Sequence, residues 1–203
     1  NSVINAITTN TANTKTITFT GDKDLTVGAS VGAGAAPLNA SLTTIDASAL
    51  TGKFVLGGVP TATATSSSSA FATAAGAATG SVTITGTKSD DVITLSDLGQ
   101  QYKIVGGDGA DTLVITSAAG TAGVATVGAG AANITGIETL RVVDGNGSAL
   151  AGNVTVNLLG TSGITALQLS NGTAGENANV VTLNNQNHAA GFAINAVGTG
   201  LTG

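Results

Sequence analysis

The sequence predicts an all-β protein of stacked short strands, part β-roll or β-helix and part sandwich-like, with little helix. Short runs rich in Val, Ile and Thr recur at close intervals, separated by Gly, Asn, Asp and Ser. The chain is 42% hydrophobic but only 2% aromatic, with no Trp, Cys or Met, so small aliphatic side chains must form the core. Such side chains suit thin, layered sheets. The 30 glycines indicate many turns.

The N-terminal region, residues 1–60, is predicted to form β-structure. Alternating apolar and polar residues predict strands, and these lie at 16–20, 25–27, within 42–52 and at 53–56. Residues 28–40 are expected to form a loop. Residues 61–80 are low in complexity and include four consecutive serines, which predicts a long loop or a soft boundary. The best short helix candidate is 70–75.

The C-terminal region, residues 81–203, has the more regular strand signals and is predicted to be β-roll- or β-helix-like. The expected strands are 82–85, 92–95, 102–105, 112–115, 139–143, 154–158, 165–169 and 180–183. No segment of the chain shows a sustained helical period with caps. The region also contains residues 106–114, a Gly- and Asp-rich stretch with the pattern of a calcium-binding motif.

One nine-residue stretch, Gly106-Gly107-Asp108-Gly109-Ala110-Asp111-Thr112-Leu113-Val114, fits the pattern G-G-x-G-x-D-x-U-x at every specified position. Glycines such as Gly107 and Gly109 let the backbone turn tightly and direct carbonyl oxygens inward. Asp108 and Asp111 add the hard anionic oxygens that Ca²⁺ prefers. The stretch therefore predicts a calcium site. The alternative is a plain Gly-rich turn with solvated carboxylates.

A weaker copy of this motif lies 20 residues earlier in the chain. Residues 86–94 align with 106–114, so that Asp91 falls on Asp111 and Ile93 on Leu113, although the second and third glycines are missing. The spacing predicts two neighbouring coils that present an Asp to the same side. Asp90 and Asp91 are thus a second, weaker candidate site. Five of the eleven acidic residues lie between Asp90 and Asp111, which favours a metal.

Composition argues against several classes of function. A net charge of −5 and a pI of about 4.4 oppose nucleic-acid binding, and there is no polybasic membrane anchor. No apolar run approaches the roughly 20 residues of a membrane-spanning helix. Without cysteine there are no disulfides or thiolate metal sites. The chain starts with Asn1 rather than Met, so we expect a processed product or a fragment.

Catalytic constellations are also missing from the pattern. His188 is the only histidine, and nothing near it in sequence suggests a Ser-His-Asp arrangement. A β-helix enzyme acting on polysaccharide is the least favoured reading, because one Tyr, four Phe and no Trp leave few rings to stack on a sugar. We expect no enzyme. Asp22, Asp24, Asp97 and residues 144–147 are expected to be turns, and Asp46 is expected to cap backbone amides.

A resemblance to known proteins rests on four segments of the sequence. The most specific is residues 106–113, and the less specific ones are residues 18–27, 44–52 and 134–140. In these segments the chain resembles bacterial surface-layer proteins and RTX-type calcium-binding exported proteins. The resemblance implies a secreted, extracellular structural subunit, or a fragment of one, that self-assembles at the cell surface into an array stabilised by Ca²⁺. With one full motif and one partial copy, it implies one or two ions.

The expected partners are copies of the same chain, with a cell-surface polysaccharide as a second option. We expect neither nucleic-acid binding nor membrane insertion. A module of a large RTX-type adhesin is the main alternative function, and a filament or sheath subunit is a variant of the structural one.

Overall fold

The part of the chain that the structure describes is all-β, as predicted. The computed structural model describes the following residues: 1–7, 15–31, 43–57, 82–95, 102–117, 125–127, 134–144, 154–157, 163–170, 181–184 and 191–197. Within these ranges it contains sixteen strands and no helix. The helix candidate at 70–75 and the low-complexity residues 61–80 lie outside the described ranges.

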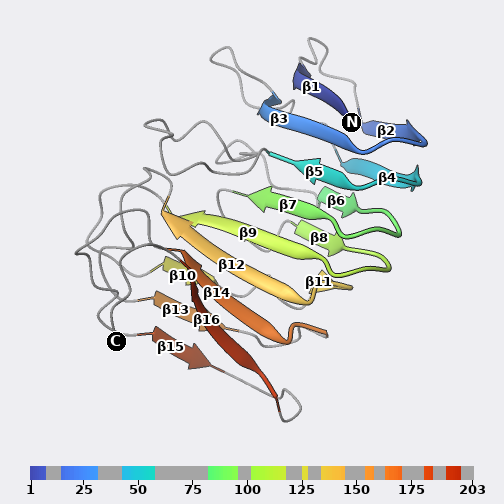
Figure 1. Ribbon diagram of the computed structural model, residues 1–203. Coiled ribbons are helices and arrows are strands. Elements are labelled where there is room, and N and C mark those ends of the chain that lie inside the picture. Colours follow the sequence, from blue (N-terminus) through green and yellow to red (C-terminus); the bar gives the residue numbers. More distant parts are fainter. Residues whose placement is uncertain are drawn as a thin grey trace.

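One large sheet of eight strands runs the length of the molecule (Figure 1). Its strands, in spatial order, are β1 (Ser2–Ile7), β3 (Leu25–Val31), β5 (Phe54–Leu56), β7 (Val92–Leu95), β9 (Thr112–Ser117), β12 (Thr139–Asp144), β14 (Ala166–Ser170) and β16 (Ala193–Val197). Spatial order follows chain order, so each strand lies on the strand of the preceding coil.

Two smaller sheets accompany the large sheet. The five-stranded sheet contains β2 (Thr16–Gly21), β4 (Thr44–Leu50), β6 (Val82–Thr85), β8 (Tyr102–Val105) and β11 (Ile134–Thr135). The three-stranded sheet contains β10 (Ala125–Val127), β13 (Val154–Asn157) and β15 (Val181–Asn184). In all three sheets the chain order of the strands is also their spatial order.

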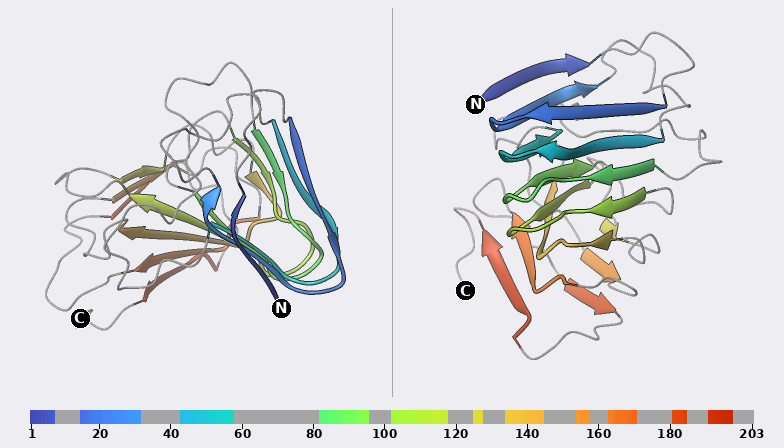
Figure 2. Two further views of the ribbon diagram at one scale, coloured as in Figure 1. Left: turned by 90° about the horizontal axis from the view of Figure 1, so that it is seen from above. Right: turned by 90° about the vertical axis from the view of Figure 1, so that its right-hand side faces the viewer.

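The chain alternates between the five-stranded sheet and the large sheet. β2 leads through a turn to β3, β4 to β5, β6 to β7, β8 to β9, and β11 to β12. We call each such strand–turn–strand unit a coil. All strand pairs within the described residues are parallel. Figure 2 shows the coils stacked on one another, with the two sheets meeting at the turns.

The strands on both sides of residues 61–80 belong to the same two sheets. β5 pairs with β7, and β4 pairs with β6, across this segment. The next coil repeats after 20 residues, because Val82 pairs with Tyr102 and Val92 with Thr112. The coil spacing predicted from the partial copy of the motif is therefore confirmed.

Most of the predicted strands are present, but four further strands, β1, β10, β11 and β16, were not expected from the sequence. The expected loop at 28–40 is wrong at its start, because β3 continues to Val31. The reason is β1, which pairs with this extension at Ser30 and Val31. A partner strand, rather than local sequence, makes those residues extended.

The core between the two sheets consists of stacked aliphatic side chains. In the five-stranded sheet one column contains only isoleucine, formed by Ile17, Ile45, Ile84, Ile104 and Ile134. The middle members of this column are buried. In-register parallel pairing places equivalent residues above one another at a strand spacing of about 4.8 Å. Identical side chains therefore pack without gaps.

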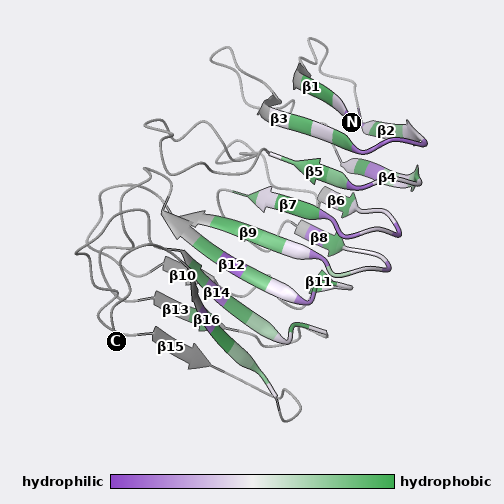
Figure 3. Ribbon diagram, viewed as in Figure 1, coloured by the Kyte–Doolittle hydropathy of each residue, from purple (hydrophilic) through white to green (hydrophobic). Residues whose placement is uncertain are grey.

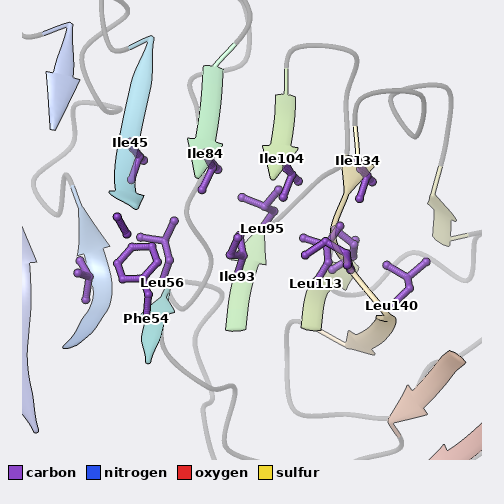
Figure 4. Close-up of a cluster of buried hydrophobic side chains, with 14 of the residues drawn as sticks. Ile45, Phe54, Leu56, Ile84, Ile93, Leu95, Ile104, Leu113, Ile134 and Leu140 are labelled. Carbon is purple, nitrogen blue, oxygen red and sulfur yellow. The ribbon is translucent and has the colours of Figure 1, made fainter. Parts of the chain in front are cut away.

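A second column, from the large sheet, faces the isoleucines (Figure 4). It contains Ile4, Val27, Leu56, Ile93, Leu113, Leu140, Leu167 and Ile194. The six inner members are buried, and Phe54 adds one ring, which lies 5.4 Å from that of Phe19. Figure 3 shows the resulting pattern, with hydrophobic strands and hydrophilic turns.

The isoleucine column supplies a test of this packing. Ile84→Ala should lower the free energy of unfolding by about 2–5 kcal/mol, because it opens a cavity between two coils. Ile17→Ala, in the partly buried residue at the end of the same column, should cost about half as much. Urea unfolding followed by circular dichroism measures both losses. Equal losses would show that the column does not pack as a continuous stack.

Candidate functional site

Two six-residue turns, residues 86–91 and 106–111, lie side by side where the two sheets meet. They join β6 to β7 and β8 to β9, and they carry the hydrophilic colour at the edge of Figure 3. The neighbouring turns, 51–53 and 136–138, have only three residues each. Asp91 and Asp111 occupy equivalent positions, one residue before strands paired at Val92 and Thr112. The predicted alignment of the two motifs thus holds in space.

The motif glycines are needed because the second turn lies directly against the first. Gly107 and Gly109 have positive φ angles of 124° and 116°. A Cβ on Gly107 would lie 1.8 Å from the carbonyl oxygen of Thr87, and one on Gly109 would lie 2.8 Å from the carbonyl carbon of Ser89. Any side chain at these positions would push the coils apart. The glycines are therefore required for the contact between the coils as well as for the shape of the turn.

Asp91 is buried and both of its carboxylate oxygens accept hydrogen bonds. Oδ1 accepts from the backbone N–H of Phe54 at 2.7 Å and from the Thr87 hydroxyl at 2.8 Å. Oδ2 accepts from the backbone N–H of Thr87. The carboxylate therefore ties its own turn to the preceding coil, since Phe54 begins β5. Both carboxylate oxygens of Asp91 are thus engaged by donors of the protein.

Asp111 makes the same link one coil further on, but only through one oxygen. Its Oδ1 accepts the backbone N–H of Asp91 at 2.8 Å. Its Oδ2 is fully buried and has no hydrogen-bond partner. The two turns differ at this oxygen: Asp91 Oδ2 accepts the backbone N–H of Thr87, whereas the N–H of Gly107, at the same position of the second turn, makes no such bond to Asp111 Oδ2. Asp111 is thus the one predicted ligand whose buried carboxylate oxygen is unpartnered.

Glu138 completes the column, and sequence reasoning missed it. Its Oε2 accepts the backbone N–H of Asp111 at 2.8 Å. A signal was present, because Asp111-Thr112-Leu113 and Glu138-Thr139-Leu140 repeat the order acid, Thr, Leu before a strand. We call Asp91, Asp111 and Glu138 the carboxylate column. Each member accepts the N–H of the residue stacked on it in the preceding coil.

A second set of carboxylates lies on the outer side of the turns. These carboxylates accept N–H groups from the following coil rather than from the preceding one. Asp90 Oδ1 accepts the N–H of Ala110 at 2.8 Å, and Asp24 Oδ1 accepts the N–H of Lys53 at 3.0 Å. In both cases the donor belongs to the following coil. Turns 86–91 and 106–111 therefore exchange two carboxylate bonds, one in each direction. Asp108 is exposed in its turn, away from the buried Asp111.

The carboxylate column concentrates negative charge at Asp111. Burial is the main reason that the pKa of Asp111 is raised from its usual value of 3.8 to about 6. The charges of Asp91, Glu138 and Asp90 act in the same direction. The hydrogen bond from the Asp91 N–H opposes them. Ionisation of Asp111 is therefore electrostatically unfavourable in the folded protein.

Two oxygen atoms near Gly106 lie at the predicted calcium site. A Cβ on Gly106 would lie 1.7 Å from the Gly136 carbonyl oxygen and 2.5 Å from Asp111 Oδ2, so two oxygens face the space that a side chain would fill. Their chemistry suits Ca²⁺. Among the described residues, however, no three acidic or histidine side chains are grouped so as to hold a metal. An ion here would need backbone carbonyls for most of its ligands.

The remaining polar turns are structural where they are described. Asp46 Oδ1 accepts the N–H of Ser48 at 2.9 Å, which confirms the predicted backbone cap. Asp22 pairs with Lys23 at 2.8 Å on the surface. His188, Asp97 and residues 145–147 lie outside the described ranges, and Asp144, which was predicted to be in a turn, is instead the last residue of β12. In those ranges, no helix has the length and hydropathy needed to cross a bilayer.

Comparison with protein-family models, curated proteins and solved structures found no match to this chain.

The close contact between the two turns predicts a large effect at Gly107. Gly107→Ala should destabilise the fold by several kcal/mol, because its Cβ meets the Thr87 carbonyl oxygen. Gly191→Ala is the matched control: φ is similar at 117°, but no atom lies within 4 Å of the new Cβ. That variant should lose only about 1 kcal/mol from backbone strain. Equal losses in urea unfolding would mean that the turns do not touch as described.

The raised pKa of Asp111 predicts a pH dependence in the presence of a chelator. The folded state holds this proton up to about pH 6, whereas the unfolded state releases it near 3.8. Stability from this group is therefore present below pH 4 and lost as the pH rises through 6, by at most about 3 kcal/mol. Urea unfolding at several pH values measures the slope.

Two variants separate this effect from other titrations. Asp111→Asn should remove the slope and still accept the Asp91 N–H through its amide oxygen. Asp91→Asn should instead destabilise the fold by about 1–3 kcal/mol at every pH. Both oxygens of Asp91 face N–H donors, so the amide group would meet one of them in either orientation. An unchanged slope in Asp111→Asn would show that another group titrates.

Proposed function

We propose that this chain is a structural subunit, or a piece of one, of an extracellular surface array, and that Ca²⁺ bound at the turn of residues 106–111 stabilises it. The role is mechanical rather than catalytic. It fits a protein whose polar side chains gather in turns and whose strands form one long stack. The resemblance of residues 106–113 to RTX-type exported proteins points to the same function.

The observation that carries the proposal is the uninterrupted ladder of the large sheet. Eight parallel strands continue from β1 to β16, with one register shift, between Ile4 and Ala6 in the β1–β3 pair, and the aliphatic column runs through all of them. Stacked coils of this kind bury a continuous core, to which each coil adds. Such a body is suited to a mechanical role.

The calcium part of the proposal rests on Asp111. Its buried, unpartnered Oδ2 and the Gly136 carbonyl oxygen would be the inner ligands, and further carbonyls of the turn would complete the set. When bound, the ion supplies positive charge to the carboxylate column. Binding energy then becomes folding energy, because the unfolded chain has no such site. Extracellular modules bind Ca²⁺ at roughly 10⁻⁴–10⁻³ M, so the cell exterior would favour the bound form.

Negative-stain electron microscopy tests the proposal directly. The purified chain should form ordered sheets or filaments in millimolar Ca²⁺ and disperse in excess EGTA. Dispersed monomers in both conditions would refute the array and favour a module of a larger adhesin. Ordered arrays in both conditions would refute the calcium part alone.

Asp111→Asn is the sharpest variant for the calcium part. It preserves the shape of the turn and removes one anionic ligand, so thermal stability should no longer rise when Ca²⁺ is added. Asp46→Asn, on the surface of β4, is the matched control and should keep the full calcium response. An unchanged response in Asp111→Asn would place the ion elsewhere.

A further inference from the structure

The two six-residue turns contain the same cradle of oxygen atoms. In the second turn, a Cβ on Gly106 would lie 2.5 Å from Asp111 Oδ2 and would also meet the carbonyl oxygen of Gly136. In the first turn, a Cβ on Gly86 would lie 2.5 Å from Asp91 Oδ2 and would meet the carbonyl oxygen of Gly106. In both turns, a buried carboxylate oxygen therefore shares its space with a glycine carbonyl of the following coil.

The two cradles differ in the donor that reaches them. In the first turn, the backbone N–H of Thr87 donates to Asp91 Oδ2. In the second turn, Gly107 takes the equivalent position, and Asp111 Oδ2 has no hydrogen-bond partner. Gly107 has a φ of 124°, which a residue with a Cβ rarely adopts. Thr87 and Gly107 therefore distinguish a cradle with its own donor from one without.

Thr87 also connects the rest of the first turn. Its buried hydroxyl donates to Asp91 Oδ1 at 2.8 Å and accepts the N–H of Ser89 at 3.0 Å. Together with the N–H of Phe54, the two groups of Thr87 supply Asp91 with three hydrogen bonds. Among the described residues, Asp111 accepts only the N–H of Asp91. Donors of the protein thus offset the charge of Asp91 much further than that of Asp111.

A cation and an N–H group compete for the same carboxylate oxygen. The hydrogen of a backbone N–H carries a partial positive charge, so an ion in the first cradle would face the Thr87 N–H at close range and be repelled. In the second cradle, Asp111 Oδ2 and the Gly136 carbonyl oxygen are both acceptors. Ca²⁺ prefers oxygen ligands of this kind. The second cradle therefore suits a cation better than the first.

We propose that the residue at the second position of each turn, Thr87 or Gly107, determines whether protein donors or Ca²⁺ satisfy the buried carboxylate. Thr87 satisfies Asp91 from within the protein, so Ca²⁺ binds beside Asp111 and not beside Asp91. The two turns together then bind one ion. The inference rests on the calcium site of the proposed function, and it specifies the number of ions at these turns and the residue that sets this number.

Equilibrium dialysis with radioactive Ca²⁺ counts the ions bound to the full chain, at protein concentrations above the roughly 10⁻⁴–10⁻³ M at which extracellular modules bind Ca²⁺. Thr87→Gly combined with Ser89→Gly gives the first turn the glycines of the second. This double variant should bind one more ion than the parent chain, because the first turn can then adopt the backbone conformation that leaves the carboxylate oxygen without a donor. An unchanged number of ions in a double variant that circular dichroism shows to be folded would overturn the proposal.

Thr87→Ala is the matched control. It removes the hydroxyl but retains the Cβ and the N–H that reaches Asp91, so it should bind as many ions as the parent chain. Asp91→Asn should also leave the number unchanged, whereas Asp111→Asn should lower it by one. An added ion in Thr87→Ala, or a lost ion in folded Asp91→Asn, would overturn the proposal.

Thermal unfolding provides an independent measurement. In excess EGTA, the double variant should melt at a lower temperature than the parent chain, because Asp91 has lost donors. Millimolar Ca²⁺ should raise its melting temperature by about twice as much as that of the parent, since each occupied site adds to stability. A rise no larger than that of the parent would count against a second ion and overturn the proposal.

The two proposals fail in different ways. If the parent chain and Asp111→Asn bind equal numbers of ions, the calcium part of the proposed function is wrong. If Asp111→Asn loses one ion but the double variant gains none, the role of Thr87 is wrong and the calcium function stands.

Discussion

In-register parallel stacking is the constraint on which the rest of this structure depends. At a strand spacing of about 4.8 Å, whatever faces inward in one coil must fit against its counterpart in the next. Five isoleucines satisfy this requirement in one column, and branched aliphatic residues satisfy it in the column opposite. The same constraint acts on polar groups at the turns. There it places Asp91, Asp111 and Glu138 above one another and makes each carboxylate the acceptor for a backbone N–H.

This arrangement explains how a chain with only 8% charged residues can contain buried acids. Where the chain leaves the sheet, the carboxylates accept backbone N–H groups that would otherwise pair with a neighbouring strand. Both carboxylate oxygens of Asp91 accept hydrogen bonds, because Thr87 donates its backbone N–H to one and its hydroxyl to the other. Only one carboxylate oxygen of Asp111 accepts a hydrogen bond, and burial, with like charges nearby, raises the pKa of this group. A proton or a cation would relieve the same unfavourable interaction, so the structural column and the candidate calcium site are two aspects of one feature.

Much of the fold could be predicted from the sequence, because alternating apolar residues and Gly- or Asp-rich turns mark the strands and their ends. The echo of residues 86–94 in 106–114 even fixed the register of two coils. β1 and β16 escaped prediction because they are extended only in the company of a neighbour. At the site, residue identity could not tell whether Asp91 faces a metal or a backbone N–H. The same carboxylate in the same turn could serve either, and the hydrogen bond from the N–H of Phe54 is a contact with the preceding coil that residue identity does not reveal.

The direction of the carboxylate column has a consequence for how the stack is built. The N–H of Phe54 is satisfied by Asp91, 37 residues later in the chain, and the N–H groups of Asp91 and Asp111 likewise wait for the coil that follows. A chain that emerges from its N-terminus would finish each turn only when the next coil arrives. The most recent coil would therefore contain a buried N–H group that still lacks its acceptor. Loss of a late coil leaves a buried donor without its carboxylate in the coil before it, whereas the N–H groups that lose Asp24 or Asp90 with an early coil belong to exposed parts of the turns.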